Sequence, residues 1–329
     1  MEEYPQIPME RTGKILRRSI HQFLKNYQYF TVASALFALP FSAAILLSQA
    51  LCPFSALLPA IHARLRSLFD AAGFPPSSEL FTVLNLKLSQ TITSSVLVLP
   101  FTLSSLLLAK ASILQALGNN PNRRSLQPTL YSIISTYNHI LVTQIYNFFL
   151  ILAANATCFS FLFIVFNCLE GFGYSSRNSV LFVSASGAVF YSIVLANALI
   201  VCNLSLVSAG LDKGGGVNSI LKACILLRGR TATALSLALP VNMLLAAIEA
   251  LFQYRVVRAY SVTKSSNSSL VLEGILIAYL YSIITVIETI VSCVFFKSCK
   301  AAYRVDQEGG YTYRIETEAA NVKVQEDLP

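Results

Sequence analysis

The chain has 329 residues and a formal net charge of +8, with 55% hydrophobic residues, only 12% charged residues and a mean hydropathy of +0.61. Soluble domains carry about 25% charged residues, so this composition excludes an ordinary soluble enzyme. It also excludes intrinsic disorder over most of the chain, because disordered segments are poor in apolar residues.

Six apolar stretches are long enough to cross a bilayer, which takes about 20 residues in a helix. They are too long for the strands of a β-barrel, which have about 10 residues. We predict an all-α polytopic fold with spans at 29–51, 90–109, 140–168, 180–207, 232–252 and 270–296. A segment 1–28 with an amphipathic helix precedes this six-span domain of residues 29–297, and a tail 298–329 that we expect to be largely disordered follows it.

Lys and Arg are distributed unevenly between the two sides of the predicted spans. The two terminal segments, the second loop and the fourth loop together hold seventeen, whereas the other loops hold seven. Because cytosolic loops carry an excess of Lys and Arg, both termini are predicted to be cytosolic. The span lengths fit the endoplasmic reticulum and the plasma membrane alike. Nucleic acid is not expected as a partner, since the basic residues are dispersed along membrane edges.

Three segments on the predicted cytosolic side, 13–27, 126–138 and 217–227, resemble amphipathic helices that lie at the interface before an odd-numbered span. The alternative is that they are ordinary cytosolic extensions of those spans. In the first, Leu16, Ile20, Phe23 and Leu24 recur at helical spacing. The first and third segments are also followed by the same Ala-Leu-Pro run, at 38–40 and 238–240. These matches indicate an internal repeat or a chance similarity of apolar sequence.

The basic residues of these segments are candidate contacts with the membrane surface. They bind anionic lipids of the cytosolic leaflet, or they only set the topology during insertion. The candidates are Lys14, Arg17, Arg18, Lys25, Arg228 and Arg230.

Glu288 is the ionisable residue that lies deepest in a predicted span, and no Asp, Lys or Arg lies well inside any of them. Tyr281 and Thr285 share its helix face. An acid in this place is either a proton or substrate site or one satisfied contact that fixes helix packing. Deep amides leave the same two alternatives, and those included in the candidate polar site are Asn147, Asn197 and Asn242.

The sequence lacks the motifs of an enzyme. The three His residues have no metal-binding spacing, and the Gly-rich run 213–216 has no phosphate-loop ending, so it is interpreted as a flexible connector. We therefore expect no catalytic residues, no cofactor and no metal. Cys299 is a candidate for palmitoylation because it follows the last span, and a disulfide between Cys52 and Cys168 is left open.

The basic motif Leu226-Leu227-Arg228-Gly229-Arg230, ahead of the fifth predicted span, resembles a motif of a plant family of uncharacterised six-span membrane proteins. In arrangement that family is similar to the membrane domain attached to some bacterial glycerophosphodiester phosphodiesterases. The resemblance covers roughly residues 11–300 and implies a six-span fold with a cytosolic N-terminal helix. It implies no hydrolysis, because no part of the bacterial catalytic domain is present in this chain.

These observations favour a non-enzymatic integral membrane protein that organises membrane or partner proteins through its basic amphipathic helices. The expected partners are the lipid bilayer, anionic lipids among them, and other membrane proteins. The alternative is a transporter of a lipid or a small solute that uses the deep polar residues.

Overall fold

The computed structural model describes residues 12–71, 79–118, 130–171, 177–212, 214–263 and 268–326. Within these ranges the chain is helical apart from short connections, and it contains no strand. Six of its helical stretches are long and apolar enough to cross a membrane, which confirms the predicted all-α multi-pass architecture. They are Tyr27–Phe54, Asn85–Gly118, Tyr131–Cys168, Ala185–Asp212, Thr231–Tyr260 and Ser268–Tyr303.

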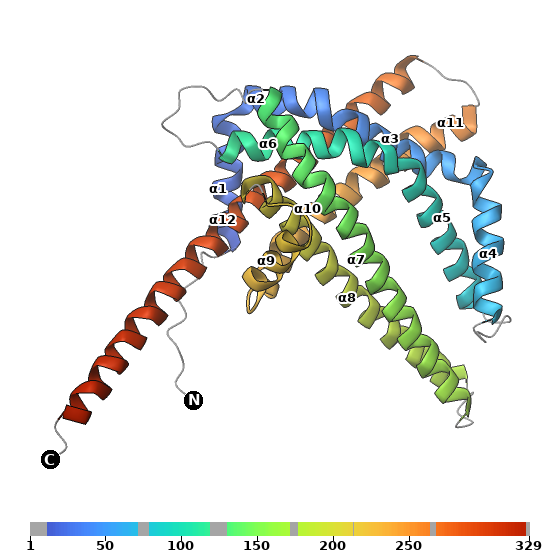
Figure 1. The fold of residues 1–329 in the computed structure, drawn as a ribbon. Helices are drawn as coiled ribbons and strands as arrows, with labels where there is room; N and C mark the ends of the chain where they lie inside the picture. Colours follow the sequence, from blue (N-terminus) through green and yellow to red (C-terminus); the bar gives the residue numbers. More distant parts are fainter. Residues whose placement is uncertain are drawn as a thin grey trace.

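The helices are labelled in Figure 1. In chain order they are α1 (Thr12–Lys25), α2 (Tyr27–Ala33), α3 (Leu39–Leu51), α4 (Leu57–Ala71), α5 (Glu79–Phe101), α6 (Leu107–Gly118), α7 (Leu130–Gly171), α8 (Arg177–Asp212), α9 (Val217–Leu227), α10 (Thr231–Phe252), α11 (Arg258–Thr263) and α12 (Ser268–Glu326). The last helix therefore continues into the tail for which the sequence analysis expects disorder.

Two of the spans are interrupted by a π-helical turn close to a proline. Ser34–Ala38 separates α2 from α3 just before Pro40, and Thr102–Leu106 separates α5 from α6 just after Pro100. Proline has no N–H to donate and disturbs the regular helix ladder, and π turns absorb such local irregularities. These spans are therefore bent helices.

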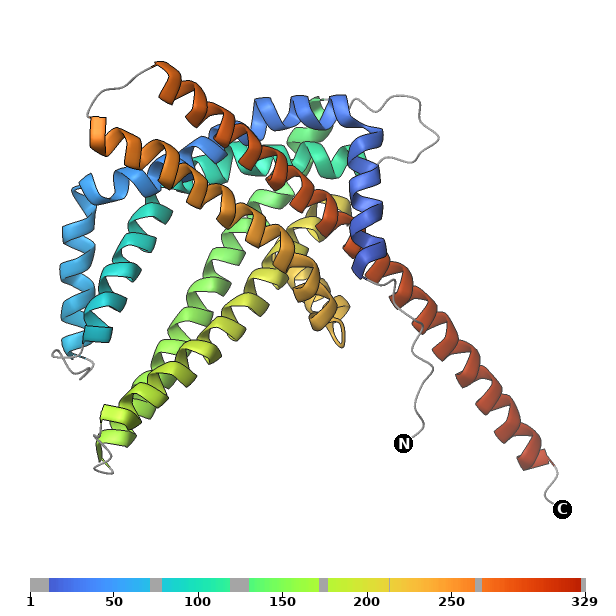
Figure 2. The ribbon, with the colours of Figure 1, turned by 180° about the vertical axis from the view of Figure 1, so that it is seen from behind.

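Two helical hairpins, α4–α5 and α7–α8, extend away from the region where α1, α6 and α12 meet (Figure 1). Seen from behind, α12 runs across the molecule beside α10 (Figure 2). The helix α1 and the last turns of α12 lie at the same end of the molecule, and α4 lies at the opposite end. This arrangement is that of an even number of spans.

The largest hydrophobic core lies where α1, α2 and α6 meet α7, α8, α9, α10 and α12. Its fully buried side chains include Ile15, Phe30, Leu114, Ile140 and Phe296. A second, smaller core joins α3, α5, α10 and α12 near the other end. Both cores use α12, so this helix holds the two halves of the bundle together.

The three segments predicted to be interfacial helices do not all form separate helices in the structure. Two of them are separate short helices, α1 and α9, each of which precedes a span. For 126–138 the prediction is wrong in its described part, because from Leu130 onward it forms the first turns of the 42-residue helix α7. Apolar periodicity reports a helix face but not whether the helix breaks before the next span.

Gly215 and Gly216, in the Gly-rich run before α9, pack closely against α7, so the interpretation of the run as a flexible connector is wrong for these two glycines. Gly216 has φ +78° and ψ −145°, a backbone conformation open only to glycine. Its N–H donates a hydrogen bond to Oγ1 of Thr143, 2.9 Å away. A Cβ on Gly215 would lie 3.2 Å from the carbonyl oxygen of His139, so this glycine allows a close approach of two backbones.

Candidate functional site

Glu288 lies on the membrane-spanning part of α12, with its side chain half-buried between α8 and α12. Its Oε1 accepts a hydrogen bond from Nδ2 of Asn203 on α8, at 3.1 Å. The bond ties the sixth span to the fourth. Asn203 is not among the amides of the predicted polar site, and nothing in the one-dimensional pattern pairs it with Glu288.

Lys110 completes this site, although it is not among the site residues predicted from the sequence. The second span was predicted to end at 109, which placed Lys110 in a loop, but α6 continues to Gly118 and Lys110 lies inside the helical stretch Asn85–Gly118. Its Nζ donates to Oδ1 of Asn203 at 3.3 Å. The statement that no Lys lies inside a span is therefore wrong. The apolar residues Ala111, Ile113 and Leu114 after Lys110 were the available signal for a longer span.

Asn203 thus stands between a cation and a carboxylate. Its amide nitrogen donates to Glu288 and its amide oxygen accepts from Lys110, which is the only assignment that satisfies both neighbours. The three side chains come from α6, α8 and α12. We refer to Lys110, Asn203 and Glu288 together as the charge-linked triad.

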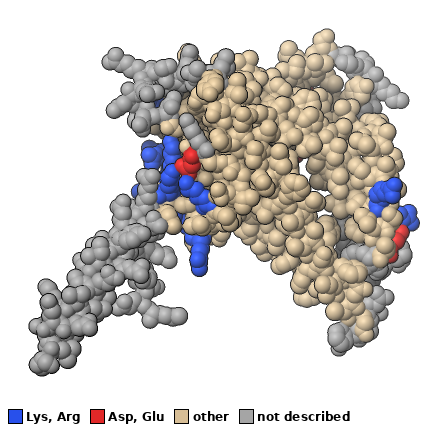
Figure 3. Space-filling view, in the orientation of Figure 1, with Lys and Arg blue, Asp and Glu red and all other residues tan. Residues whose placement is uncertain are grey.

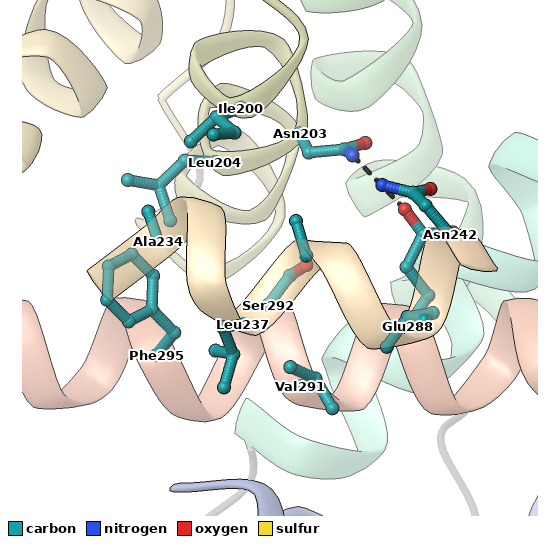
Figure 4. Close-up of a pocket in the computed structure, with 12 residues that line it drawn as sticks. Ile200, Asn203, Leu204, Ala234, Leu237, Asn242, Glu288, Val291, Ser292 and Phe295 are labelled. Atoms are coloured by element: carbon teal, nitrogen blue, oxygen red, sulfur yellow. Dashed lines mark hydrogen bonds between the residues drawn. The ribbon is translucent and has the colours of Figure 1, made fainter. Parts of the chain in front are cut away.

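A cavity of about 50 Å³ lies next to the triad, between α8, α10 and α12 (Figure 4). Its polar lining comes from Asn203, Asn242, Glu288 and Ser292, and the remaining lining is apolar. A second cavity of about 10 Å³ lies beside Lys110, and it shares Asn203, Glu288 and Ser292 with the first. Asn203, Glu288 and Ser292 therefore lie between the two small spaces, and Lys110 borders only the smaller one.

Tyr281 and Thr285 lie on the predicted face of α12, but their hydrogen bonds go to groups other than the Glu288 side chain. Thr285 donates to the carbonyl oxygen of Tyr281 at 3.0 Å, and the Tyr281 hydroxyl donates to Oε1 of Glu249 at 3.1 Å. Gln49 donates to the other Glu249 oxygen at 2.9 Å and accepts from Gln253 at 3.2 Å. These contacts form a second polar cluster, which joins the first, fifth and sixth spans.

Gln49 and Glu249 are separated by 200 residues, the same offset that relates the two Ala-Leu-Pro runs. Corresponding positions of the two similar segments therefore touch each other in space. Such contacts are expected near the axis that relates two repeats.

The predicted amides have different environments. Asn147 is buried, donates to the carbonyl oxygen of Cys202 at 3.1 Å and accepts from Ser205 at 3.0 Å, so it joins α7 to α8. Asn197 is exposed on α8 and donates to the carbonyl oxygen of Ile193 in its own helix, at 3.0 Å. Asn242 is exposed on α10 at the edge of the larger cavity.

Comparison with known proteins assigns the chain to a protein family. Residues 8–308 match the model of a family described as a domain of unknown function, DUF8558. The chain belongs to this DUF8558 family. No curated protein and no solved structure matches it. The family assignment covers all six spans and supplies no residue roles.

The candidate surface residues of this DUF8558 chain lie at the end where α1 and α12 meet, and basic side chains gather there in Figure 3. Most of them are exposed: Lys14, Arg17, Arg18, Lys25 and Arg228. Arg230 instead donates to the carbonyl oxygen of Cys299, at 3.0 Å. It therefore anchors the start of α10 to α12.

Other basic residues at this end hold helix ends together. Asp212, at the end of α8, accepts from both Lys222 and Lys300. Lys297 donates to the carbonyl oxygen of Leu117 at 2.7 Å, close to the end of α6, where the last carbonyls carry partial negative charge. Part of the positive charge is thus used for internal contacts.

The seven cysteines are all unpaired, so Cys52 and Cys168 form no disulfide in this structure. The Cys299 side chain is fully buried, and its acylation would require the surrounding helices to move. Within the described residues, no group of three or more His, Cys, Asp or Glu side chains is placed to hold a metal ion.

Proposed function

We propose that this protein is a non-enzymatic membrane organiser, which gathers anionic lipids and partner membrane proteins at its basic end. The observation that carries the proposal is the outer flank of α1. There Ile20 and Leu24 are 45% and 61% exposed, next to the basic residues of the same helix.

The apolar arc of α1 is wider than its packing requires. Ile15, Ser19 and Phe23 face the core, whereas Ile20 and Leu24 lie on an adjacent face that no part of the described chain covers. A helix with an uncovered apolar flank beside Lys and Arg is suited to the headgroup region, where the apolar flank enters the bilayer and the cations meet anionic lipid. Each Lys or Arg near such a surface contributes about 1 kcal/mol.

The helix α9 supports the same proposal with a different surface. Its outer face exposes Val217, Leu221 and Ile225, each about half exposed. Its inner face packs Ala223 and Leu226 into the core. This uncharged outer face fits lipid chains or the apolar helix of a partner membrane protein.

The proposal includes the orientation of the protein in the membrane. The excess of Lys and Arg at the end formed by α1, α9 and the last turns of α12 supports a cytosolic location for that end and for both termini. Endoplasmic reticulum and plasma membrane both supply anionic lipid on that side. The resemblance to the plant family and to the bacterial membrane domain supports a role of the membrane domain itself, without chemistry.

The test is lipid enrichment around the purified protein. The protein is extracted with its surrounding lipid, and bound lipids are quantified by mass spectrometry relative to the bulk membrane. We expect several-fold enrichment of anionic lipid, which falls to the bulk ratio in Lys14→Gln/Arg17→Gln. Arg64→Gln/Arg66→Gln on α4, at the other end, is the matched control, because it removes the same charge from exposed positions. Equal enrichment in both variants would contradict the proposal.

A second candidate function is transport of a small solute through the bundle. The charge-linked triad and the adjoining cavity support it, because ionisable groups inside a membrane mark substrate or ion routes. Here we expect Glu288→Gln to abolish solute flux in proteoliposomes. Wild-type flux in this variant would remove Glu288 from the route.

A further inference from the structure

The cavity beside Glu288 is lined by polar groups to which the protein offers no hydrogen bond. Asn203 occupies Oε1 of Glu288, and within the described residues Oε2 of Glu288, the amide of Asn242 and the hydroxyl of Ser292 have no partner. All three line one space within the membrane-spanning part of the bundle. Glu288 and Ser292 are half-buried, and Asn242 is exposed at the rim of the cavity. In a membrane their unbonded polar atoms would face hydrocarbon, which is costly, so their convergence on one cavity indicates a polar occupant.

The cavity is also divided by polarity. In Figure 4 the polar side chains Asn203, Asn242 and Glu288 lie at one end. The other end is formed by apolar side chains, among them Ile200, Leu204, Ala234 and Phe295. An occupant that satisfies both ends carries hydrogen-bonding groups on one side and an apolar group on the other.

The size of the cavity and the charges beside it narrow the chemical class of the occupant further. A water molecule needs about 10–15 Å³ of such space, so a cavity of about 50 Å³ holds roughly four non-hydrogen atoms. Lys110 and Glu288 already balance each other through Asn203. A charged ligand would leave an unbalanced charge in surroundings of low dielectric constant, whereas a neutral ligand would not.

We propose that this cavity is a binding site for a small uncharged solute of the simple amide type, with donor and acceptor at one end and an apolar group at the other. Oε2 of Glu288 accepts from the ligand N–H, and the amide of Asn242 donates to the ligand carbonyl. The apolar group lies toward Leu204 and Phe295. The inference names a substrate class for the second candidate function, on which it rests for any role in transport, but binding does not require flux.

Acetamide is the probe, because it has four non-hydrogen atoms and this distribution of polarity. Saturation-transfer difference NMR on the full chain in nanodiscs measures its binding through the methyl protons. Acetate and acetamidinium have the same size with opposite charges, so they test the requirement for neutrality. Asn242→Leu removes a cavity group, and Asn197→Leu is the matched control, since Asn197 is exposed on α8 and bonds only its own helix.

We expect saturable transfer to acetamide in the wild type and in Asn197→Leu, and a loss of at least about fivefold in affinity in Asn242→Leu, the cost of about one hydrogen bond. Ser292→Ala is the second variant and should weaken binding in the same direction. No saturable signal, an undiminished signal in Asn242→Leu, or preferred binding of either ion would overturn the proposal. Binding without acetamide flux in proteoliposomes would leave the site in place and reject transport alone.

Discussion

At the scale of single residues, hydrogen bonds through Asn203 on α8 link two ionisable side chains inside the bundle, Lys110 and Glu288. An amide between a cation and a carboxylate lets both charges stay inside the membrane domain without a direct ion pair. Glu288 could be singled out from the sequence because it is a lone acid in an apolar run. Lys110 is harder to recognise, because a Lys near the end of an apolar run usually extends to the interface, and only the apolar residues after it point to a longer span.

The coupling within the triad can be measured with a double-mutant cycle. Lys110→Met and Glu288→Gln should each destabilise the protein by roughly 1–3 kcal/mol, since each leaves a polar partner unsatisfied. The double variant should lose less than the sum, because no uncompensated charge remains. Unfolding in detergent followed by circular dichroism gives the three differences. Strict additivity would show that the two charges do not interact.

At the scale of elements, the short helices α1 and α9 pack against the core at one end, and glycines allow the connection before α9 to approach α7 closely. The backbone of Gly216 has a positive φ at the start of α9, and a Cβ there would lie 3.3 Å from the ring of Tyr146. The sequence shows a run of glycines and predicts flexibility. Only the contact with α7 shows that the run is a tight connection.

Gly216→Ala should therefore destabilise the protein by about 1–3 kcal/mol, from backbone strain. Gly214→Ala is the control two residues earlier, because a Cβ there meets no atom within 4 Å and its φ is not positive. Thermal unfolding of the two variants compares them directly. A similar melting temperature for both would refute the strain argument.

At the scale of the whole molecule, the alternation of spans places α9 at one end and the end of α7 at the other (Figure 1). Two native thiols report on these ends, because Cys224 and Cys168 are exposed whereas the other five cysteines are buried. The charge bias supports the assignment of the Cys224 end to the cytosol.

Labelling with a membrane-impermeant maleimide tests that orientation. In intact cells, Cys224→Ser should still be labelled, through Cys168, whereas Cys168→Ser should be labelled only after permeabilisation. The variant that lacks both thiols is the control and should stay unlabelled until it is unfolded, because the remaining cysteines are buried. The reverse pattern would invert the proposed topology.

The sequence by itself determined the number of spans, their order and the end at which the basic residues collect. Hydropathy and the positive-inside bias can be read from the composition along the chain. They predict the spans because a bilayer admits helices only when they are apolar and have internally bonded backbones, and because cytosolic loops carry the excess of Lys and Arg. Only the tertiary structure decided that Tyr281 bonds Glu249, that Glu288 is linked to Lys110, and that Gln49 meets Glu249. These pairings depend on how bent helices cross and rotate, and apolar helix faces of similar composition do not encode that rotation in their periodicity.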